Sequence, residues 1–506
     1  MLQIRVENVN CQISGSIDQK HVKELSDMLS YDHPGYNFMA GGRGGFGSQG
    51  KFGGWDGKVR LLQKSGKFPI GLLSMVKKYL DKNNLEYEVV DNRPNISYGA
   101  PVPQINKEFE PRDYQIKAVK AATKKGSGII KVATGGGKSF IISSIVAKYN
   151  IPTIVYVIGI ELLHQMKKTI ESAYGIECGI VGGGECDVSK QVTIMTIWSA
   201  ASAFNKKIKI TDNDTTLDAK KHINALNKAM VRKKVQEAQL FIFDECQYAA
   251  SETLQFLHRA SVSAKHRFLF SGTPWRDTGD DILIEAVSGP KIVDVNATFL
   301  IKNDYLVRPK IYFLDVPVMR GVGKNYHDVY KNYIVENDDR NDLIIKSARK
   351  LVKEGKKVLI LVVRVGHGNI LMDKLSDEFR VKFLDGAKST KNRMDSIQEM
   401  KDGKLDILIA SKIFDQGVDI PELDALILAG SGKSSGRALQ RIGRVIRRSK
   451  GKKEAIVVEF FDNCKYLRDH SEARIKVYKS EPGFEIKIQK NKAIKSYPKR
   501  GPVKWA

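Results

Sequence analysis

The sequence VATGGGKS, at residues 132–139, decides the fold around it. It follows the apolar run 128–132 and leads into 140–146, whose apolar spacing is that of a buried helix. This order predicts a strand, a glycine turn and a helix, in which backbone N–H groups and the positive end of the helix surround a polyphosphate. Lys138 would then reach the β- and γ-phosphates, and the Ser139 hydroxyl would hold Mg²⁺. An ordinary glycine turn is the alternative, because the strict G-x-x-x-x-G-K-[ST] pattern lacks its first glycine.

The chain is strongly basic. Its 506 residues carry 83 Lys and Arg against 57 Asp and Glu, which gives a net charge of +26 and a pI near 9.6. A chain of this length suggests about three or four domains. The excess positive charge attracts polyanions, and nucleic acid is the favoured partner, ahead of an anionic membrane surface.

Cysteine and histidine usage argues against disulfides and zinc. The five cysteines are odd in number and never spaced C-x-x-C, and the nine histidines are scattered. We therefore expect reduced thiols. No apolar run approaches the roughly 18 residues of a membrane span, and the N-terminus lacks a signal-peptide pattern. These features predict a cytoplasmic protein, in the host-cell cytoplasm if a phage encodes it, with no membrane partner.

Two sets of alternating short apolar strands and amphipathic helices follow Pro111 and Pro309. Such alternation predicts an α/β fold with two parallel sheets, each covered by helices on both faces. The expected strands are 129–133, 153–158, 192–197, 240–243 and 268–271 in the first sheet, and 358–363, 381–383, 407–410, 425–428 and 456–460 in the second. Only the first set has a glycine-lysine loop, so we expect the nucleotide to lie in a cleft between the two sheet domains.

Composition places the remaining boundaries. We expect a small α+β domain at 1–97, a proline-marked linker at 98–110, the sheet domains at 111–297 and 298–466, and a basic extension at 467–506. The glycine-rich stretch around Trp55 and Lys58 could be a nucleic-acid surface or a packed turn. The lysine-rich interruption at 205–235 is interpreted as a solvated helical insertion, with a nucleic-acid contact as the alternative.

Two further motifs carry chemistry. Asp244 and Glu245 end an apolar strand, where the first could hold Mg²⁺ and the second could orient and deprotonate the attacking water. Gln440, Arg444 and Arg447 fall on one face of an expected helix, from which guanidinium groups could stabilise the γ-phosphate in the transition state. A helix-capping acidic pair and a basic surface helix are the respective alternatives.

Together these motifs resemble the ordered motifs of superfamily 2 helicases, over about residues 110–460. The segments that carry the resemblance are 111–115, 133–139, 244–247, 271–274, 417–421 and 440–447. Residues 53–62 and 68–72 also look like the first domain of UvsW-type phage recombination helicases, which are related in function to RecG-like branched-DNA remodellers. The resemblance implies two tandem RecA-like domains, with ATP and Mg²⁺ as cofactors.

The resemblance also implies site residues. ATP would be bound by Arg112, Gln115, Thr134, Gly135, Gly136, Gly137, Lys138, Ser139, Gly417 and Asp419. Ser271 and Thr273 would couple hydrolysis to domain movement, and Gln440, Arg444 and Arg447 would complete the site. DNA contacts would come from Trp55, Lys58, Thr196, Arg364, His367 and Lys412. Gln247 stands where the family has histidine, which puts the coupling contact in doubt.

The sequence thus predicts an ATP-dependent DNA helicase or translocase that unwinds and branch-migrates forked and junction DNA in phage recombination, replication or repair. The family implies 3′-to-5′ movement. We expect a monomer that acts on branched and single-stranded DNA, with phage recombination or single-strand-binding proteins as further partners. An RNA helicase or R-loop-displacing enzyme is one alternative, and a double-strand translocase without strand separation is another.

Overall fold

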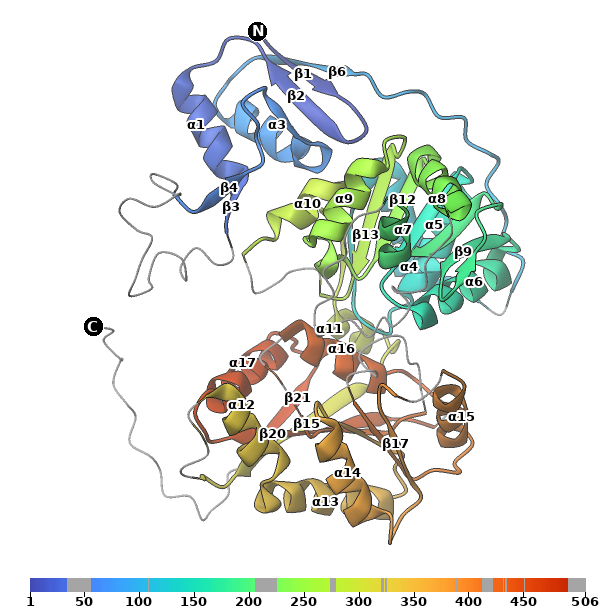
Figure 1. Ribbon diagram of the computed structural model, residues 1–506, viewed down its shortest axis with the longest axis vertical. Coiled ribbons are helices and arrows are strands. Elements are labelled where there is room, and N and C mark those ends of the chain that lie inside the picture. Colours follow the sequence, from blue (N-terminus) through green and yellow to red (C-terminus); the bar gives the residue numbers. More distant parts are fainter. Residues whose placement is uncertain are drawn as a thin grey trace. The chain divides into compact units, whose positions relative to one another are not determined.

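The structure is a computed structural model with two compact units, Met1–Asn296 and Ala297–Ala506, each described by itself below (Figure 1). The described residues are 1–33, 56–107, 109–204, 225–273, 279–319, 323, 325–387, 390–411, 422–430, 432, 435–449 and 451–489. Among them, no helix is long and apolar enough to cross a membrane. The five cysteines are free thiols.

The first unit begins with a small α+β subdomain, as expected from the alternation of Leu2, Ile4 and Val6, which are all buried. Its sheet has the strand order β5-β2-β1-β6, in which β6 runs parallel to β1 and β2 runs antiparallel to it. Its elements are β1 (Leu2–Val6), β2 (Asn10–Ser14), α1 (Gln19–Met28), β3 (Ser30–Asp32), β4 (Lys58–Arg60), β5 (Lys67–Pro69), η1 (Ile70–Leu72), α3 (Leu73–Lys82) and β6 (Tyr87–Asp91).

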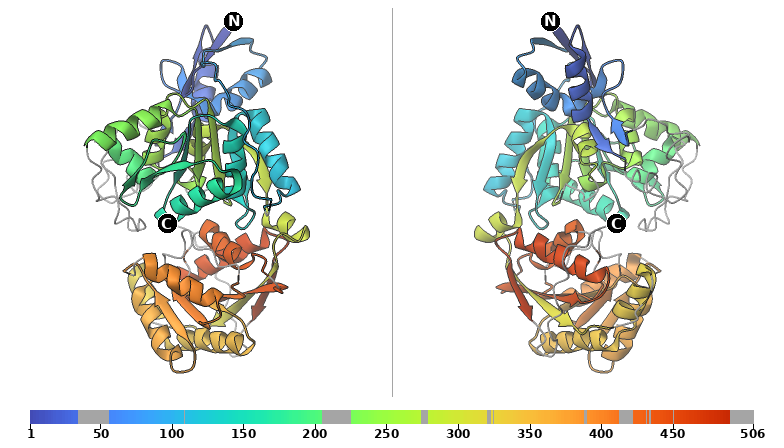
Figure 2. Two further views of the ribbon diagram at one scale, coloured as in Figure 1. Left: turned by 90° about the vertical axis from the view of Figure 1, so that its right-hand side faces the viewer. Right: turned by 90° about the vertical axis from the view of Figure 1, so that its left-hand side faces the viewer.

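This subdomain packs directly on the sheet domain that follows it (Figure 2). Ala286 belongs to the same hydrophobic cluster as the core of the subdomain. At Gly71 a Cβ atom would overlap the carbonyl oxygen of Glu285, so only glycine permits this close approach. The buried Arg267 donates from Nε to the Asn8 carbonyl at 3.2 Å. The two parts therefore form one packed body.

The first sheet domain has the strand order β10-β9-β11-β8-β12-β13-β7-β14, and each pair except β9 with β10 is parallel. Its strands are β7 (Ser127–Val132), β8 (Thr153–Val157), β9 (Cys178–Gly182), β10 (Glu185–Cys186), β11 (Val192–Thr196), β12 (Leu240–Asp244), β13 (His266–Ser271) and β14 (Lys291–Val295). All residues of β8, β11, β12 and β13 are buried, as helices on both faces require. The five expected strands are confirmed.

The helices of this domain are α4 (Asp113–Lys125), α5 (Lys138–Tyr149), α6 (Ile160–Tyr174), α7 (Ile197–Ala203), α8 (Ala225–Glu237), α9 (Glu252–Ala260) and α10 (Ile282–Ser288). The end of the predicted insertion forms α8, and Val231 and Val235 of that helix are buried in the domain core. This part is therefore a packed helix and not a solvated one. The rest of the insertion, 205–224, lies outside the described residues.

The second unit contains a seven-stranded sheet of order β17-β18-β16-β19-β20-β15-β21, and every pair is parallel. Its strands are β15 (Arg308–Val316), β16 (Val358–Leu361), β17 (Val381–Leu384), β18 (Ile407–Ala410), β19 (Ala425–Leu428), β20 (Glu454–Asp462) and β21 (Glu485–Gln489). Its helices are α11 (Ala297–Lys302), α12 (Tyr326–Val329), η4 (Tyr330–Val335), α13 (Asp338–Lys353), α14 (Val365–Leu375), α15 (Thr390–Lys401), α16 (Ser435–Val445) and α17 (Leu467–Lys479).

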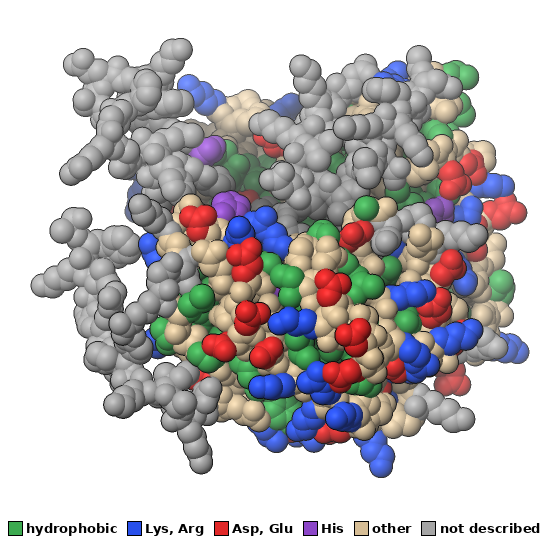
Figure 3. All heavy atoms as spheres, turned by 60° about the horizontal axis from the view of Figure 1, so that its bottom comes forward, with side chains coloured by type: hydrophobic (Ala, Val, Ile, Leu, Met, Phe, Trp, Pro, Cys, Tyr) green, Lys and Arg blue, Asp and Glu red, His purple; other side chains and the backbone are tan. Residues whose placement is uncertain are grey.

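The basic extension expected at 467–506 is wrong for its first part. α17 packs on β20, and β21 pairs with β15, so these elements complete the second sheet domain. Leu467, Ile475 and Tyr478 of α17 are buried, a pattern that its many charged residues obscure in the sequence. The face of this unit that carries α13 and α14 has acidic and basic side chains interspersed (Figure 3).

Candidate ATP and nucleic-acid sites

The 132–139 stretch forms the predicted strand, turn and helix. Val132 ends β7, and α5 begins at Lys138. Gly135 and Gly137 have φ values of 84° and 76°, in the left-handed region that favours glycine. The Gly136 N–H donates to the Ala133 carbonyl at 2.9 Å, which closes the turn. The loop thus lies at the positive end of a buried helix, where it can receive phosphate groups.

The 111–115 motif supports this loop from one side. Gln115 Nε2 donates to the Gly136 carbonyl at 3.3 Å, and the Tyr114 hydroxyl donates to the same oxygen at 2.6 Å. Gln115 Oε1 accepts from the Arg112 backbone N–H at 2.9 Å. A Cβ at residue 137 would overlap Gln115 Nε2. The structure therefore brings Arg112 and Gln115 to the loop, together with Tyr114, which the sequence did not single out.

The two carboxylates lie at the end of β12, two strands from β7 and at the same edge of the sheet as the loop. Asp244 is buried, and burial followed by the neighbouring Glu245 charge raises its pKa to about 7, while Lys138 opposes the shift. Glu245 has a φ of 71°. A left-handed backbone is costly for residues other than glycine. Glu245 therefore keeps this conformation because the surrounding structure imposes it.

A chain of hydrogen bonds links Glu245 to the 271–273 segment. Gln247 Nε2 donates to Glu245 Oε2 at 2.8 Å, and the Ser271 hydroxyl donates to Gln247 Oε1 at 2.7 Å. The Thr273 N–H in turn donates to Ser271 Oγ at 3.0 Å. The contact that Gln247 put in doubt is therefore made, by a side-chain amide in place of an imidazole.

The same segment lies against the phosphate loop. A Cβ at Gly272 would come within 3.2 Å of both the backbone nitrogen and the Oγ1 of Thr134. Gly272 thus allows the 271–273 backbone to pass close to the loop. The loop, the carboxylates and the coupling segment form one connected site in the first unit.

In the second unit, Gln440 and Arg444 lie on α16 and are partly buried, as expected for a positioned helix. Ile442 and Val445 anchor the opposite face of α16 in the core, and Ile446, just after the helix, is buried as well. Arg447 is a correction, because α16 ends at Val445. Its backbone instead forms an isolated antiparallel bridge with Leu306.

Some predicted DNA contacts take other roles. His367 is fully buried, and its Nε2 lies 2.8 Å from Asn341 Oδ1. Burial and the Arg340 charge lower its pKa to about 3, so it is a neutral core residue and not a strand contact. Thr196 is buried and caps α7, its Oγ1 accepting from the Ser199 N–H at 3.2 Å.

The remaining predicted residues divide into two groups. Lys58 lies on β4 and is partly exposed, and its backbone N–H donates to Asp56 at 3.1 Å. Arg364 is exposed at the start of α14. The others lie outside the described residues: Trp55, Lys412, Gly417 and Asp419.

An aromatic surface that the sequence did not indicate surrounds Arg364. Tyr326 is 37% exposed and Tyr466 is 38% exposed, and their ring centroids lie 6.2 Å apart. The Tyr326 ring also lies 5.8 Å from that of His470. Arg364 Nη2 lies 3.1 Å from His327 Nδ1. We call these five residues the tyrosine surface. Exposed rings beside cations are suited to stacking on nucleic-acid bases.

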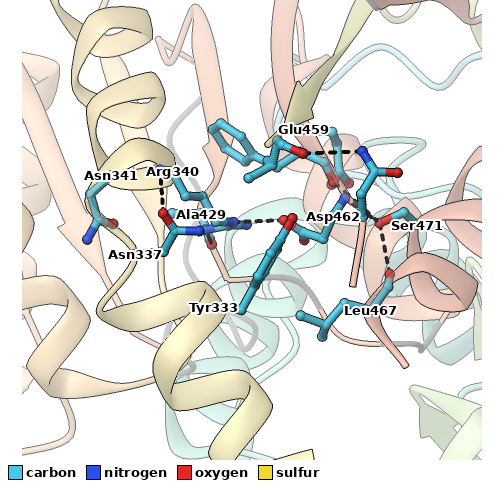
Figure 4. A network of polar contacts seen from close by, with 12 residues as sticks. Tyr333, Asn337, Arg340, Asn341, Ala429, Glu459, Asp462, Leu467 and Ser471 are labelled. Carbon is cyan, nitrogen blue, oxygen red and sulfur yellow. Dashed lines mark hydrogen bonds and ion pairs between the residues drawn. The ribbon is translucent and has the colours of Figure 1, made fainter. Parts of the chain in front are cut away.

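A buried polar network includes residues of α13 and α17 and residues at the ends of β19 and β20 (Figure 4). Arg340 donates to Asp462 at 2.8 Å and to the Ala429 carbonyl at 2.6 Å, while Ser471 donates to the Leu467 carbonyl at 3.0 Å. Because removal of Arg340 or Asp462 would leave the other charge buried without its partner, the loss of either residue would destabilise this part of the second unit.

Three segments of the chain match known families. Residues 9–91 match "DNA helicase UvsW, N-terminal", residues 108–276 match "Type III restriction enzyme, res subunit", and residues 341–449 match "Helicase conserved C-terminal domain".

Curated relatives and solved structures agree with these matches. The DNA 3′-5′ translocase XPB2 of Sulfurisphaera tokodaii is 26% identical over 423 residues, which cover 76% of this chain and 88% of that protein. The ATP-dependent DNA helicase uvsW of Enterobacteria phage T4 is 24% identical over 468 residues, which cover 87% of each protein. The structure of S. cerevisiae Dbp5 bound to RNA and ADP BeF3 has a TM-score of 0.53 at 14% identity, covers 75% of this chain and 90% of its own, and supports the fold.

The two parallel-sheet domains are thus RecA-like, and the candidate ATP site lies in the first of them. The chain belongs to the superfamily 2 helicases, ATP-hydrolysing enzymes, and carries a UvsW-type N-terminal domain.

Proposed function

We propose that this chain is an ATP-dependent DNA helicase or translocase that unwinds and branch-migrates forked and junction DNA. The observation that carries the proposal is the hydrogen-bonded chain from Glu245 through Gln247 and Ser271 to Thr273, beside the phosphate loop. It joins the residue placed to activate water with the segment placed to move when ATP is hydrolysed. Such a link is what a motor requires of its ATP site.

In this site Lys138 neutralises the β- and γ-phosphates, and loop N–H groups hold the phosphate oxygens. Glu245 orients the attacking water and accepts its proton. Gln247 donates to one oxygen of the Glu245 carboxylate at 2.8 Å and so helps to orient it. The mutual position of loop and carboxylate therefore contributes to catalysis by holding the reacting groups in place.

The residues present fit a magnesium ion. Asp244 is a buried carboxylate whose pKa is raised to about 7 by burial and then by the Glu245 charge, and a bound cation would favour its ionised form. Among the described residues, no group of three or more acidic, histidine or cysteine side chains could hold a metal alone. Mg²⁺ suits such a site, since it binds one or two protein oxygens together with substrate phosphates. When bound, it would neutralise developing phosphate charge, with Ser139 and Asp244 as its protein ligands.

We also propose that the second RecA-like domain contributes Gln440, Arg444 and Arg447 to the nucleotide, and that Gly417 and Asp419 sense it. The guanidinium groups would stabilise charge on the transferred phosphoryl group. The burial of the apolar face of α16 supports this role for Arg444, because the helix has one fixed orientation within its domain.

The tyrosine surface is a proposed contact for a single strand. Base stacking on its rings and charge pairing of phosphates with Arg364 would give binding with little sequence preference and strong salt dependence. The net charge of +26 favours the same class of partner.

The named relatives support DNA as the substrate and 3′-to-5′ as the direction, since one is a DNA 3′-5′ translocase and another an ATP-dependent DNA helicase. The match of residues 9–91 to the UvsW N-terminal family supports branched DNA and a role in phage recombination, replication or repair. We propose a monomer that acts in the host-cell cytoplasm, with recombination or single-strand-binding proteins as partners.

A substrate panel tests this proposal. ATP hydrolysis and strand displacement are measured on forked DNA, four-way junctions, linear duplex DNA and RNA duplex. We expect forks and junctions to stimulate hydrolysis most and to be unwound. Hydrolysis on linear duplex without strand separation would favour the double-strand translocase, and displacement of RNA alone would favour an RNA helicase.

Two variants provide the controls for this panel. Lys138→Ala should bind ATP weakly, and Glu245→Gln should bind it normally but hydrolyse it at least about a hundredfold more slowly. Near-normal DNA-stimulated hydrolysis in both variants would contradict the assigned site.

A further inference from the structure

A basic pocket lies where the N-terminal subdomain meets the first sheet domain. Its volume is about 370 Å³, and its apolar walls include Ile70, Leu73 and Pro290. Lys77 of α3, Lys125 at the end of α4, Lys265 just before β13 and Arg93 just after β6 also line it. Among the described residues, no side chain that lines the pocket is acidic.

Only some of the basic side chains that line this pocket have partners within the protein. Arg93 is bound by both oxygens of Asp91, at 2.8 and 2.6 Å, and Lys265 donates to the Pro94 carbonyl at 3.2 Å. Lys77 lies over the Tyr87 ring at 6.0 Å. Within the described part of the chain, neither Lys77 nor Lys125 is placed in an ion pair. These two lysines therefore leave a positive charge for a ligand.

Ser288 gives an independent sign of a ligand. It lines the pocket and is 3% exposed, yet its hydroxyl has no hydrogen-bond partner among the described residues. A buried hydroxyl left without a partner is costly, so native structures seldom keep one. The hydroxyl oxygen itself has almost no exposed surface, so a rotation of the side chain toward the pocket would bring it to an acceptor such as a phosphate oxygen.

The pocket is separate from the ATP site. Ser127, which lines it, begins β7, and Val132 at the other end of the same strand leads into the phosphate loop. At about 3.3 Å per residue, the two ends of β7 are roughly 16 Å apart, so the pocket lies by the amino end of the strand and the phosphate loop follows its carboxyl end. A ligand here would not compete with ATP.

We propose that this pocket binds one nucleotide unit of the DNA strand, with its phosphate at Lys77, Lys125 and Ser288 and its base or sugar against the apolar walls. The volume lies in the range of small-ligand sites, and cations beside apolar walls match the two halves of a nucleotide. This inference rests on the proposed function, because it names a DNA contact of the same enzyme. It also makes the packing of the N-terminal subdomain part of a binding site.

The test uses the full chain and forked DNA with a fluorescent label, followed by anisotropy over a salt series without ATP. Lys77→Ala/Lys125→Ala should weaken binding about tenfold near 0.1 M salt and lower the salt slope by about one. Lys117→Ala/Lys120→Ala removes the same charge from the exposed side of α4 and serves as the matched control. Equal affinities for the two double variants would overturn the proposal.

Ser288→Ala keeps the folding question apart from the binding question. It removes a buried hydroxyl without a partner, so the melting temperature should not fall, while DNA affinity should drop about threefold or more. Unchanged affinity would count against a phosphate at this position. Photo-cross-linking of 5-iodouracil-substituted forks should place adducts on residues 70–77 or 287–290, and adducts confined to other peptides would contradict the assignment.

Calorimetry with free dAMP distinguishes a free nucleotide from one within a strand. If Lys77→Ala/Lys125→Ala abolishes dAMP binding but leaves fork affinity unchanged, the pocket is a mononucleotide site and the proposal is wrong. DNA-stimulated ATP hydrolysis by the wild-type protein separates this failure from failure of the proposed function. If hydrolysis is stimulated while the pocket variants bind normally, only the inference about the pocket fails.

Discussion

Gln247 donates its amide N–H to Glu245 at 2.8 Å and accepts the Ser271 hydroxyl proton at 2.7 Å, so that one neutral side chain bridges the carboxylate and the coupling segment. An amide has a donor and an acceptor at every pH, whereas a histidine in this position changes its hydrogen-bonding pattern on protonation. The Gln247 side chain therefore keeps both its donor and its acceptor at every pH.

Gln247→Ala should reduce DNA unwinding more than ATP hydrolysis, because it breaks the bridge and leaves Glu245 in place. We expect the number of base pairs separated per ATP hydrolysed to fall about tenfold. Gln247→His should restore much of that ratio above about pH 7 and lose it below about pH 6, near the usual pKa of histidine. Parallel unwinding and hydrolysis assays at several pH values measure this, and a pH-independent histidine variant would refute it.

Asp244→Asn should stabilise the protein in the absence of ATP while abolishing hydrolysis. The pKa of Asp244 is raised from 3.8 to about 7 in the folded state, so its contribution to stability is present below about pH 4 and is lost as pH rises through 7. The neutral amide avoids that loss. Thermal melting at pH 8 should show a rise of about 2–5 °C, and at pH 4 the difference should vanish. A variant that melts lower at pH 8 would contradict the raised pKa.

Arg444→Ala should bind ATP with near-normal affinity but hydrolyse it about a hundred to a thousand times more slowly, because the guanidinium acts on the transition state. Fluorescent-nucleotide binding and single-turnover hydrolysis separate the two effects. Arg448→Ala is the matched control, since Arg448 is exposed and pairs with Asp304 at 2.8 Å on the surface of its own unit. Loss of ATP binding in Arg444→Ala would indicate a structural role.

Gly71→Ala should loosen the N-terminal subdomain, because the added methyl group would overlap the Glu285 carbonyl oxygen. We expect faster proteolysis in the 92–112 segment and weaker junction unwinding, with single-strand-stimulated ATP hydrolysis retained. Gly366→Ala, where nothing lies within 4 Å of the added Cβ, controls for the substitution itself. Unchanged proteolysis and junction unwinding would show that the subdomain tolerates the shift.

Tyr466→Ala should weaken binding to single-stranded DNA by about five- to tenfold, as loss of one stacking platform predicts. Tyr466→Phe keeps the ring and should bind normally. Anisotropy on labelled oligonucleotides measures both variants. Equal weakening by alanine and phenylalanine would point to the hydroxyl and away from stacking.

Sequence periodicity predicted the sheet domains well where strands are fully apolar, as at 153–158 and 240–243. It missed β9, because Gly179 interrupts the apolar run of that strand. Residue 179 is glycine because a Cβ there would overlap the Asp187 carbonyl oxygen. It also missed α17, whose charged residues hide a narrow buried stripe, and β21, in which no residue is fully buried. The periodicity of a sequence shows which side chains face the core, but it does not show which other segment of the chain packs closely against a given residue.

The candidate site was likewise predictable only in part from the sequence. The motif residues around Lys138 and Glu245 were predictable because phosphate and water chemistry restricts both residue type and spacing. Tyr114 and the Tyr326–Tyr466 pair could not be found in this way, since their roles depend on contacts that the fold creates. His367 was misplaced because a polar residue in a motif can equally be a core residue with one buried partner.

The pairing of β15 determines when the second unit can form during synthesis. β15, at Arg308–Val316, pairs on one side with β20 and on the other with β21, which are made much later in the chain. The first unit, by contrast, is complete at Asn296. On the ribosome the ATP-binding domain can therefore fold early, while its partner domain waits for residue 489, and a prematurely ended chain would bind nucleotide without being able to work as a motor.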